Sequence, residues 1–137
     1  MSKLFKIKHY IYYLIRAKGA FSVHSPFVFT LFNNVIKRKN VQKGSKKEQL
    51  IENIYLFYPN FTIINLSVKT NYENILSVIK KPYTIIIFPD INSNKENYLT
   101  WKEIINSENK FISVNIWHIG LLINNPNIKQ KQNYILK

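Results

Sequence analysis

The sequence predicts an α/β fold, in which helices cover a sheet that is closed by antiparallel strands. Helical and strand patterns alternate between residues 48 and 109, and two further strand patterns follow, an order that describes an α/β sandwich. The segment YTIIIF at 83–88 is nearly all apolar, as strands buried on both faces of a parallel sheet usually are. The 137 residues, 46% of them hydrophobic, are enough for a real core.

The first element expected along the chain is an amphipathic basic helix over residues 3–18, which Gly19 ends. Lysines 3, 6 and 8 lie on its other faces. We expect its apolar face to dock on the core of the domain, and a helix that contacts RNA or a membrane surface is the alternative. The apolar face consists of Leu4, Ile7, Ile11, Leu14 and Ile15.

A second helix is expected to begin in FSVHSPFVFTLFNNVI, residues 21–36. Ser25 is a good N-cap, and Pro26 fits the first helical position because its missing N–H would have no partner there. Only His24 is left unexplained by a helix start. No other histidine or carboxylate stands near it in the sequence, so the prediction is a structural or exposed histidine and not a general base.

Residues 37–48 form a polar basic connector, which divides an N-terminal helical arm (1–40) from an α/β domain (41–137). A helix is expected from Glu48 to Pro59, because Leu50, Ile51, Ile54 and Phe57 share one face. The remaining patterns predict about four strands in the order β-α-β-α-β-β. These are strands at 61–66, 83–88, 111–123 and 133–137, with helices at 71–81 and 94–109.

The formal charge of +13 is compatible with binding to RNA or to another anionic surface. The charge is weak evidence for such binding, because the composition suggests an AT-rich gene, whose codons favour lysine. The chain has 18 lysines, 18 asparagines and 22 isoleucines, but 2 arginines. The absence of cysteine excludes disulfides and thiolate chemistry and fits a cytoplasmic protein. We expect no targeting segment and no membrane span, because the run YIYYLI is too short.

Several segments resemble a bacterial group of class I S-adenosylmethionine-dependent methyltransferases. They are RAKGAFSVHSPFVFTLFNNVI at 16–36, IIIFPDI at 85–91, WKEI at 101–104, FISVNIWHIGLLI at 111–123 and YILK at 134–137. The resemblance implies a reduced Rossmann-like sheet with N-terminal helices and S-adenosylmethionine as the cofactor. If strands two to four of the family order three-two-one-four-five-seven-six are missing, strands one, five, seven and six remain side by side.

The cofactor loop departs from the family pattern. Asn65 stands where the family has an acidic residue, and Ser67 and Asn71 stand at glycine positions, where backbone must approach the cofactor closely. Residues 71–83 are too few for the missing strands. Asp90 follows the strand at 83–88 without a second carboxylate and is a poor cation site, although ligands of α/β proteins bind at this edge.

We therefore expect a methyltransferase-family protein with weak or lost cofactor binding, no catalytic residue and no metal. The alternative is a small basic module that contacts RNA or an anionic surface. Aromatic residues such as Trp101 and Trp117, and His118 beside them, are expected to pack in the core and the hairpin. A homodimer formed through an edge strand is a further possible arrangement.

Overall fold

The computed structural model describes residues 3–16, 26–37, 44–106, 111–128 and 132–136. It confirms an α/β protein with a mixed sheet of five strands. Its elements are α1 (Lys3–Arg16), α2 (Pro26–Leu31), the π-helical turn η2 (Phe32–Ile36), α3 (Lys46–Phe57), β1 (Thr62–Asn65), α4 (Tyr72–Ile79), β2 (Thr84–Pro89), α5 (Lys95–Ile105), β3 (Ile112–Asn115), β4 (Ile119–Asn124) and β5 (Gln132–Ile135).

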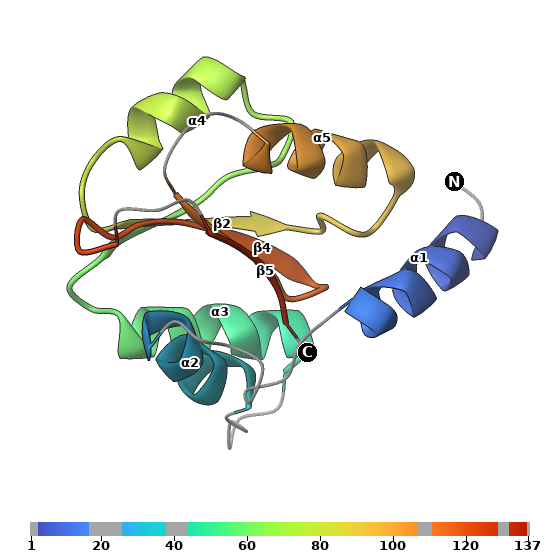
Figure 1. The fold of residues 1–137 in the computed structure, drawn as a ribbon, viewed down its shortest axis with the longest axis horizontal. Helices are drawn as coiled ribbons and strands as arrows, with labels where there is room; N and C mark the ends of the chain where they lie inside the picture. The colour runs from blue at the N-terminus through green and yellow to red at the C-terminus, as the bar shows by residue number, and fades with distance from the viewer. Residues whose placement is uncertain (1–2, 17–25, 38–43, 107–110, 129–131, 137) are drawn as a thin grey trace.

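The sheet has helices on both faces, as Figure 1 shows. The strands lie in the order β1-β2-β4-β3-β5, with β1 parallel to β2, β3 parallel to β5, and β4 antiparallel to both of its neighbours. The chain passes from β1 to β2 through α4 and from β2 to β3 through α5. Both crossovers run in the same direction across the sheet, so α4 and α5 share one face, while α2 and α3 cover the other (Figure 1).

The expected single strand over 111–123 is two strands, which raises the strand number from about four to five. The chain turns at Ile116–His118, where Trp117 has a φ of 66° and the N–H of His118 donates to the carbonyl of Ile116 at 2.8 Å. A left-handed tryptophan is uncommon, and neither glycine nor proline marks this turn in the sequence. As a result β4 lies between β2 and β3, and β5 takes the outer edge.

The interior strand β2 is buried on both faces, as its apolar sequence predicted. Ile85 and Ile87 belong to the core beneath α2, η2 and α3, whereas Ile86 and Phe88 belong to the core beneath α4 and α5. Trp101 fills this second core, as expected, with its ring centroid 5.8 Å from that of Phe88. The two cores fix the sheet between its helical layers.

Gly120 in β4 leaves room for Trp101. A Cβ at this position would lie 2.8 Å from Cη2 of Trp101 and 2.9 Å from Cδ1 of Ile91. Such distances are shorter than normal van der Waals contact, so the absence of a side chain allows α5 to approach the sheet closely. This approach sets the position of the turn that precedes α5.

The helices on the other face belong to the same core as the sheet. Pro26 begins α2, as predicted, while His24 and Ser25 lie outside the described residues. The side chain of Ser45 caps α3 by accepting a hydrogen bond from the N–H of Glu48 at 3.1 Å. The helix therefore begins at Lys46, two residues before the expected start at Glu48. Asn53 in α3 donates to the carbonyl of Val35 in η2 at 3.0 Å. These contacts hold α3 against the preceding helical segment.

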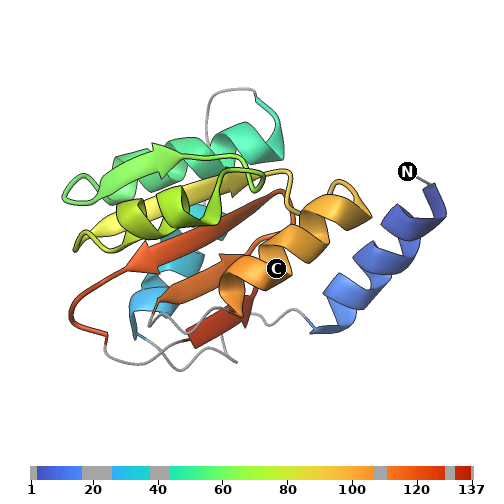
Figure 2. The same cartoon turned by 90° about the horizontal axis from the view of Figure 1, so that it is seen from above.

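Helix α1 docks through a face opposite to the expected one. It lies beside one edge of the sheet in both views (Figure 2). His9 and Tyr13 are buried because they meet the aromatic rings of the turn and of α5, and the half-buried Phe5, four residues before His9, stacks on the ring of His9. The face expected to dock stays exposed, at Leu4 (58%), Ile7 (58%), Ile11 (52%), Leu14 (39%) and Ile15 (77%).

Candidate functional site

The carboxyl ends of four strands meet at one edge of the sheet. β1 ends at Asn65, β2 at Pro89, β3 at Asn115 and β5 at Ile135, and the antiparallel pairing of β4 brings the turn 116–118 to the same edge. Ligands of open α/β sheets bind at such an edge. The loop that follows β1, the turn that follows β2, and α1 are therefore the parts to inspect for a site.

In the loop after β1, polar side chains serve local hydrogen bonds. The hydroxyl of Ser67 accepts from the N–H of Lys69 at 3.1 Å, and the N–H of Thr70 donates to the carbonyl of Ser67 at 3.0 Å. The side-chain oxygen of Asn71 accepts from the N–H of Glu73 at 2.8 Å and caps α4. Ser67 and Asn71 thus have turn and cap roles, and Asn65 ends β1 without a charge to offer a ligand.

S-adenosylmethionine fits these residues poorly. Residues 65–71 contain no glycine, so side chains stand where the methyltransferases that the sequence resembles present bare backbone to the cofactor. The same residues contain no carboxylate, and a carboxylate is the group that would accept hydrogen bonds from ribose hydroxyls. We derive no catalytic step through this cofactor.

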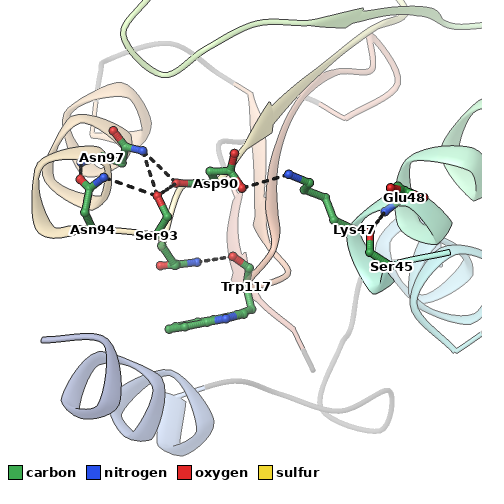
Figure 3. A network of polar contacts seen from close by, with 9 residues as sticks. Ser45, Lys47, Glu48, Asp90, Ser93, Asn94, Asn97 and Trp117 are labelled. Carbon is green, nitrogen blue, oxygen red and sulfur yellow. Dashed lines mark hydrogen bonds and ion pairs between the residues drawn. The ribbon is translucent and has the colours of Figure 1, made fainter. Parts of the chain in front are cut away.

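Asp90 organises the turn after β2, as Figure 3 shows. Its φ is 62°, and its backbone carbonyl accepts from the hydroxyl of Ser93 at 2.9 Å and from the amide of Asn97 at 3.1 Å. Asn94 caps α5 by accepting from the N–H of Asn97 at 2.8 Å. The backbone of Asp90 therefore anchors the start of α5.

The side chain of Asp90 faces a cation. Its Oδ1 atom lies 3.2 Å from Nζ of Lys47 in α3, and both side chains are partly exposed (Figure 3). This ion pair neutralises the carboxylate of Asp90, and the ammonium group of Lys47 would repel a metal ion bound there. Among the described residues no three histidine or carboxylate side chains are grouped as metal ligands.

A buried polar network, which the sequence reasoning missed, joins α1 to this edge. Nε2 of His9 lies 2.6 Å from Oδ1 of Asn92, whose amide nitrogen donates to Oδ1 of Asn115 at 3.0 Å and to the carbonyl of Trp117 at 2.8 Å. Because the amide nitrogen of Asn92 donates both of those bonds, its side-chain oxygen is the acceptor, and the Nε2–H of His9 is the donor. The only sequence signal for this network was a histidine four residues from aromatic neighbours.

Aromatic packing surrounds the network. The ring of His9 lies 4.2 Å from that of Tyr98 and 5.3 Å from that of Trp117, measured between centroids. The hydroxyl of Tyr13 donates to the carbonyl of Leu136, next to β5, and burial raises the pKa of Tyr13 above its ordinary value. These contacts position α1 against the edge of the sheet.

A groove of about 780 Å³ lies between α1, η2, the start of α3 and the turn 116–118. Burial and the nearby charges of Lys46 and Lys47 lower the pKa of His118 beside it, and Asp90 partly opposes this shift. Three lysines and no carboxylate are among its lining residues, and most of the rest are apolar. The lining consists of Lys6, Ile7, Tyr10, Ile11, Tyr13, Leu14, Ile36, Lys37, Lys46, Ile116, Trp117 and His118.

Comparisons with family models, curated proteins and solved structures gave no match for this chain. Among the described residues, no helix has both the length and the apolar character needed to cross a bilayer.

Proposed function

We propose that this chain is a shortened relative of class I S-adenosylmethionine-dependent methyltransferases in which cofactor binding is weak or lost. The strand order supports the relationship. β1, β2, β4 and β3 lie in the sequence that strands one, five, seven and six of those enzymes would have if strands two to four were missing. β5 extends the sheet by one strand beyond that order.

The loop after β1 is the observation that carries the proposed loss of cofactor binding. Side chains at 67 and 71 replace the bare backbone of the related enzymes and are engaged in a turn and in the cap of α4. The ion pair between Lys47 and Asp90 occupies the carboxylate that follows β2. A sulfonium-bearing nucleoside would thus meet side chains in place of bare backbone, and a carboxylate that already has a cationic partner.

Titration calorimetry of the full chain with S-adenosylmethionine and with S-adenosylhomocysteine tests the proposal. We expect no saturable heat up to millimolar ligand. Thermal unfolding supplies an independent readout, because a ligand at 100 times its Kd would add about 2.7 kcal/mol to the free energy of unfolding. Micromolar binding of either compound, or methyl transfer to any acceptor, would overturn it.

The second candidate function is a basic module that binds an anionic surface, and one specific observation favours it. Apolar and lysine side chains are exposed together on α1 and along the groove, with no carboxylate in either set. Such a surface matches a partner that offers negative charge next to apolar material.

A further inference from the structure

The outward face of α1 is an apolar stripe. Leu4, Ile7, Ile11 and Ile15 are spaced three or four residues apart, all are more than half exposed, and they lie opposite the docked residues His9 and Tyr13. We call these four residues the outer stripe. Because the opposite face makes the contacts to the sheet edge, the outer stripe faces away from that edge.

Positive charge borders the outer stripe. Lys3 and Lys8 flank it on α1, Lys6 lies on the groove side of the helix, and α1 contains no aspartate or glutamate. The groove adjoins the stripe, since Ile7 and Ile11 line it, and it adds Lys37 and Lys46 on its far side. The described surface on this side of the molecule therefore combines aliphatic side chains with lysines from α1, η2 and α3.

Building on the second candidate function, we propose that the outer stripe and its lysines dock this protein on an anionic lipid surface. A helix of 14 residues is about 21 Å long, which is too short to span a bilayer but sufficient to lie in the plane of its interface. In this position the aliphatic side chains enter the acyl boundary and the ammonium groups meet lipid phosphates.

Lipid fits the outer stripe better than RNA does. RNA would satisfy the lysines, but its phosphate backbone would leave four aliphatic side chains against a charged, hydrated partner. Tyr10, exposed beside the groove, has the mixed apolar and polar character that is enriched at membrane–water interfaces. Charge and apolar area on one helix thus point to the same partner.

Vesicle flotation of the full chain tests this inference. We expect the protein to float with vesicles of phosphatidylcholine containing 30% phosphatidylglycerol, and to bind much less to pure phosphatidylcholine or at 1 M salt. The double variant I7Q/I11Q should weaken binding by about tenfold for each isoleucine, because glutamine keeps helix propensity and removes apolar area. The triple variant K3Q/K6Q/K8Q should weaken binding by about a hundredfold at low salt.

A matched control is Leu56→Gln on α3, since Leu56 is 56% exposed and lies outside both α1 and the groove. It should float like the unmodified protein. All variants replace exposed side chains, so unchanged far-ultraviolet circular dichroism and thermal unfolding would show that their folds are intact.

Depth measurement gives a second readout, because the chain has no cysteine and one introduced thiol can be labelled uniquely. A nitroxide on Ile11→Cys should become accessible to oxygen and protected from a water-soluble nickel complex when anionic vesicles are added. A nitroxide on Leu56→Cys should remain in water.

Several outcomes would overturn the inference. These are no flotation with anionic vesicles, equal flotation of I7Q/I11Q, or a nitroxide at position 11 that stays in water. Salt-sensitive binding to mixed RNA without vesicle binding would assign the lysines to nucleic acid instead. A dimer that I7Q/I11Q dissociates, without vesicle binding, would assign the outer stripe to a second copy. None of these results changes the calorimetric test of cofactor binding.

Discussion

Replacing Gly120 with alanine should destabilise the fold, because α5 and β4 approach each other most closely there. The new methyl group would lie 2.8 Å from Cη2 and 2.9 Å from Cζ3 of Trp101. β4 cannot move away, since it is paired with β2 on one side and β3 on the other. Trp101 is 1% exposed and packs against Phe88, so its ring has to shift to admit the methyl group.

The size of the effect follows from two opposing terms. In an open strand, alanine would stabilise relative to glycine by about 0.5–1 kcal/mol. Forcing a methyl group into a filled core costs about 1–3 kcal/mol. The difference between these terms is about 0–2.5 kcal/mol, and from its middle we expect G120A to lower the free energy of unfolding by about 1 kcal/mol.

Urea unfolding followed by circular dichroism at 222 nm measures this change. The variant W101F supplies the control, because a smaller ring relieves the clash. G120A should be less harmful in the W101F background, which a double-mutant cycle would report as a coupling between the two positions. The reasoning fails if G120A is as stable as the unmodified protein, or if the two substitutions show no coupling.

Three other predictions concern the sheet edge. Asp90→Asn should lower the free energy of unfolding by less than about 1 kcal/mol in urea titrations, because the ion pair of Asp90 is exposed. Asp90→Val should cost about 1–2 kcal/mol more, because a β-branched residue is disfavoured at this left-handed position. Equal losses for the two variants would contradict this prediction. His9→Ala should undock α1 by leaving Asn92 without its donor, seen as a red shift of Trp117 fluorescence and faster cleavage within α1, and an unchanged spectrum would count against it. His118 has a lowered pKa in the folded protein, so as the pH drops below about 6.5 the unfolded chain binds the proton first and the free energy of unfolding decreases. His118→Gln should reduce this decrease between about pH 7.5 and 5. Identical urea midpoints for the variant and the unmodified protein across this range would refute the prediction.

Much of the α/β framework could be predicted from residue patterns. The apolar run of β2, the apolar face of α3 and its stop at Pro59 are local signals, and the strands and helices expected between residues 48 and 109 appear within a few residues of the expected bounds. The split of 111–123 could not be predicted, because Trp117 adopts its turn conformation under tertiary contacts with α1.

The docking face of α1 is the instructive error. Apolar periodicity selected Leu4, Ile7 and Ile11, but the helix has bulky side chains on nearly every face, so periodicity could not distinguish the face that packs. The choice depends on residues more than 80 positions away, because His9 needs Asn92 and the aromatic rings near it. A single sequence offers no measure of such long-range pairing.

The turn at Ile116–His118 has a consequence for how the protein assembles. It joins β3 and β4, which among the described strands are the consecutive pair that runs antiparallel, so these two strands can form a hairpin locally within microseconds, before any crossover closes. We expect this hairpin to be the nucleus on which β2 and β5 then condense. A register slip of one residue in this hairpin would move the side chain of Leu121 to the opposite face of the sheet. A hairpin in the wrong register would therefore trap the folding of the whole chain.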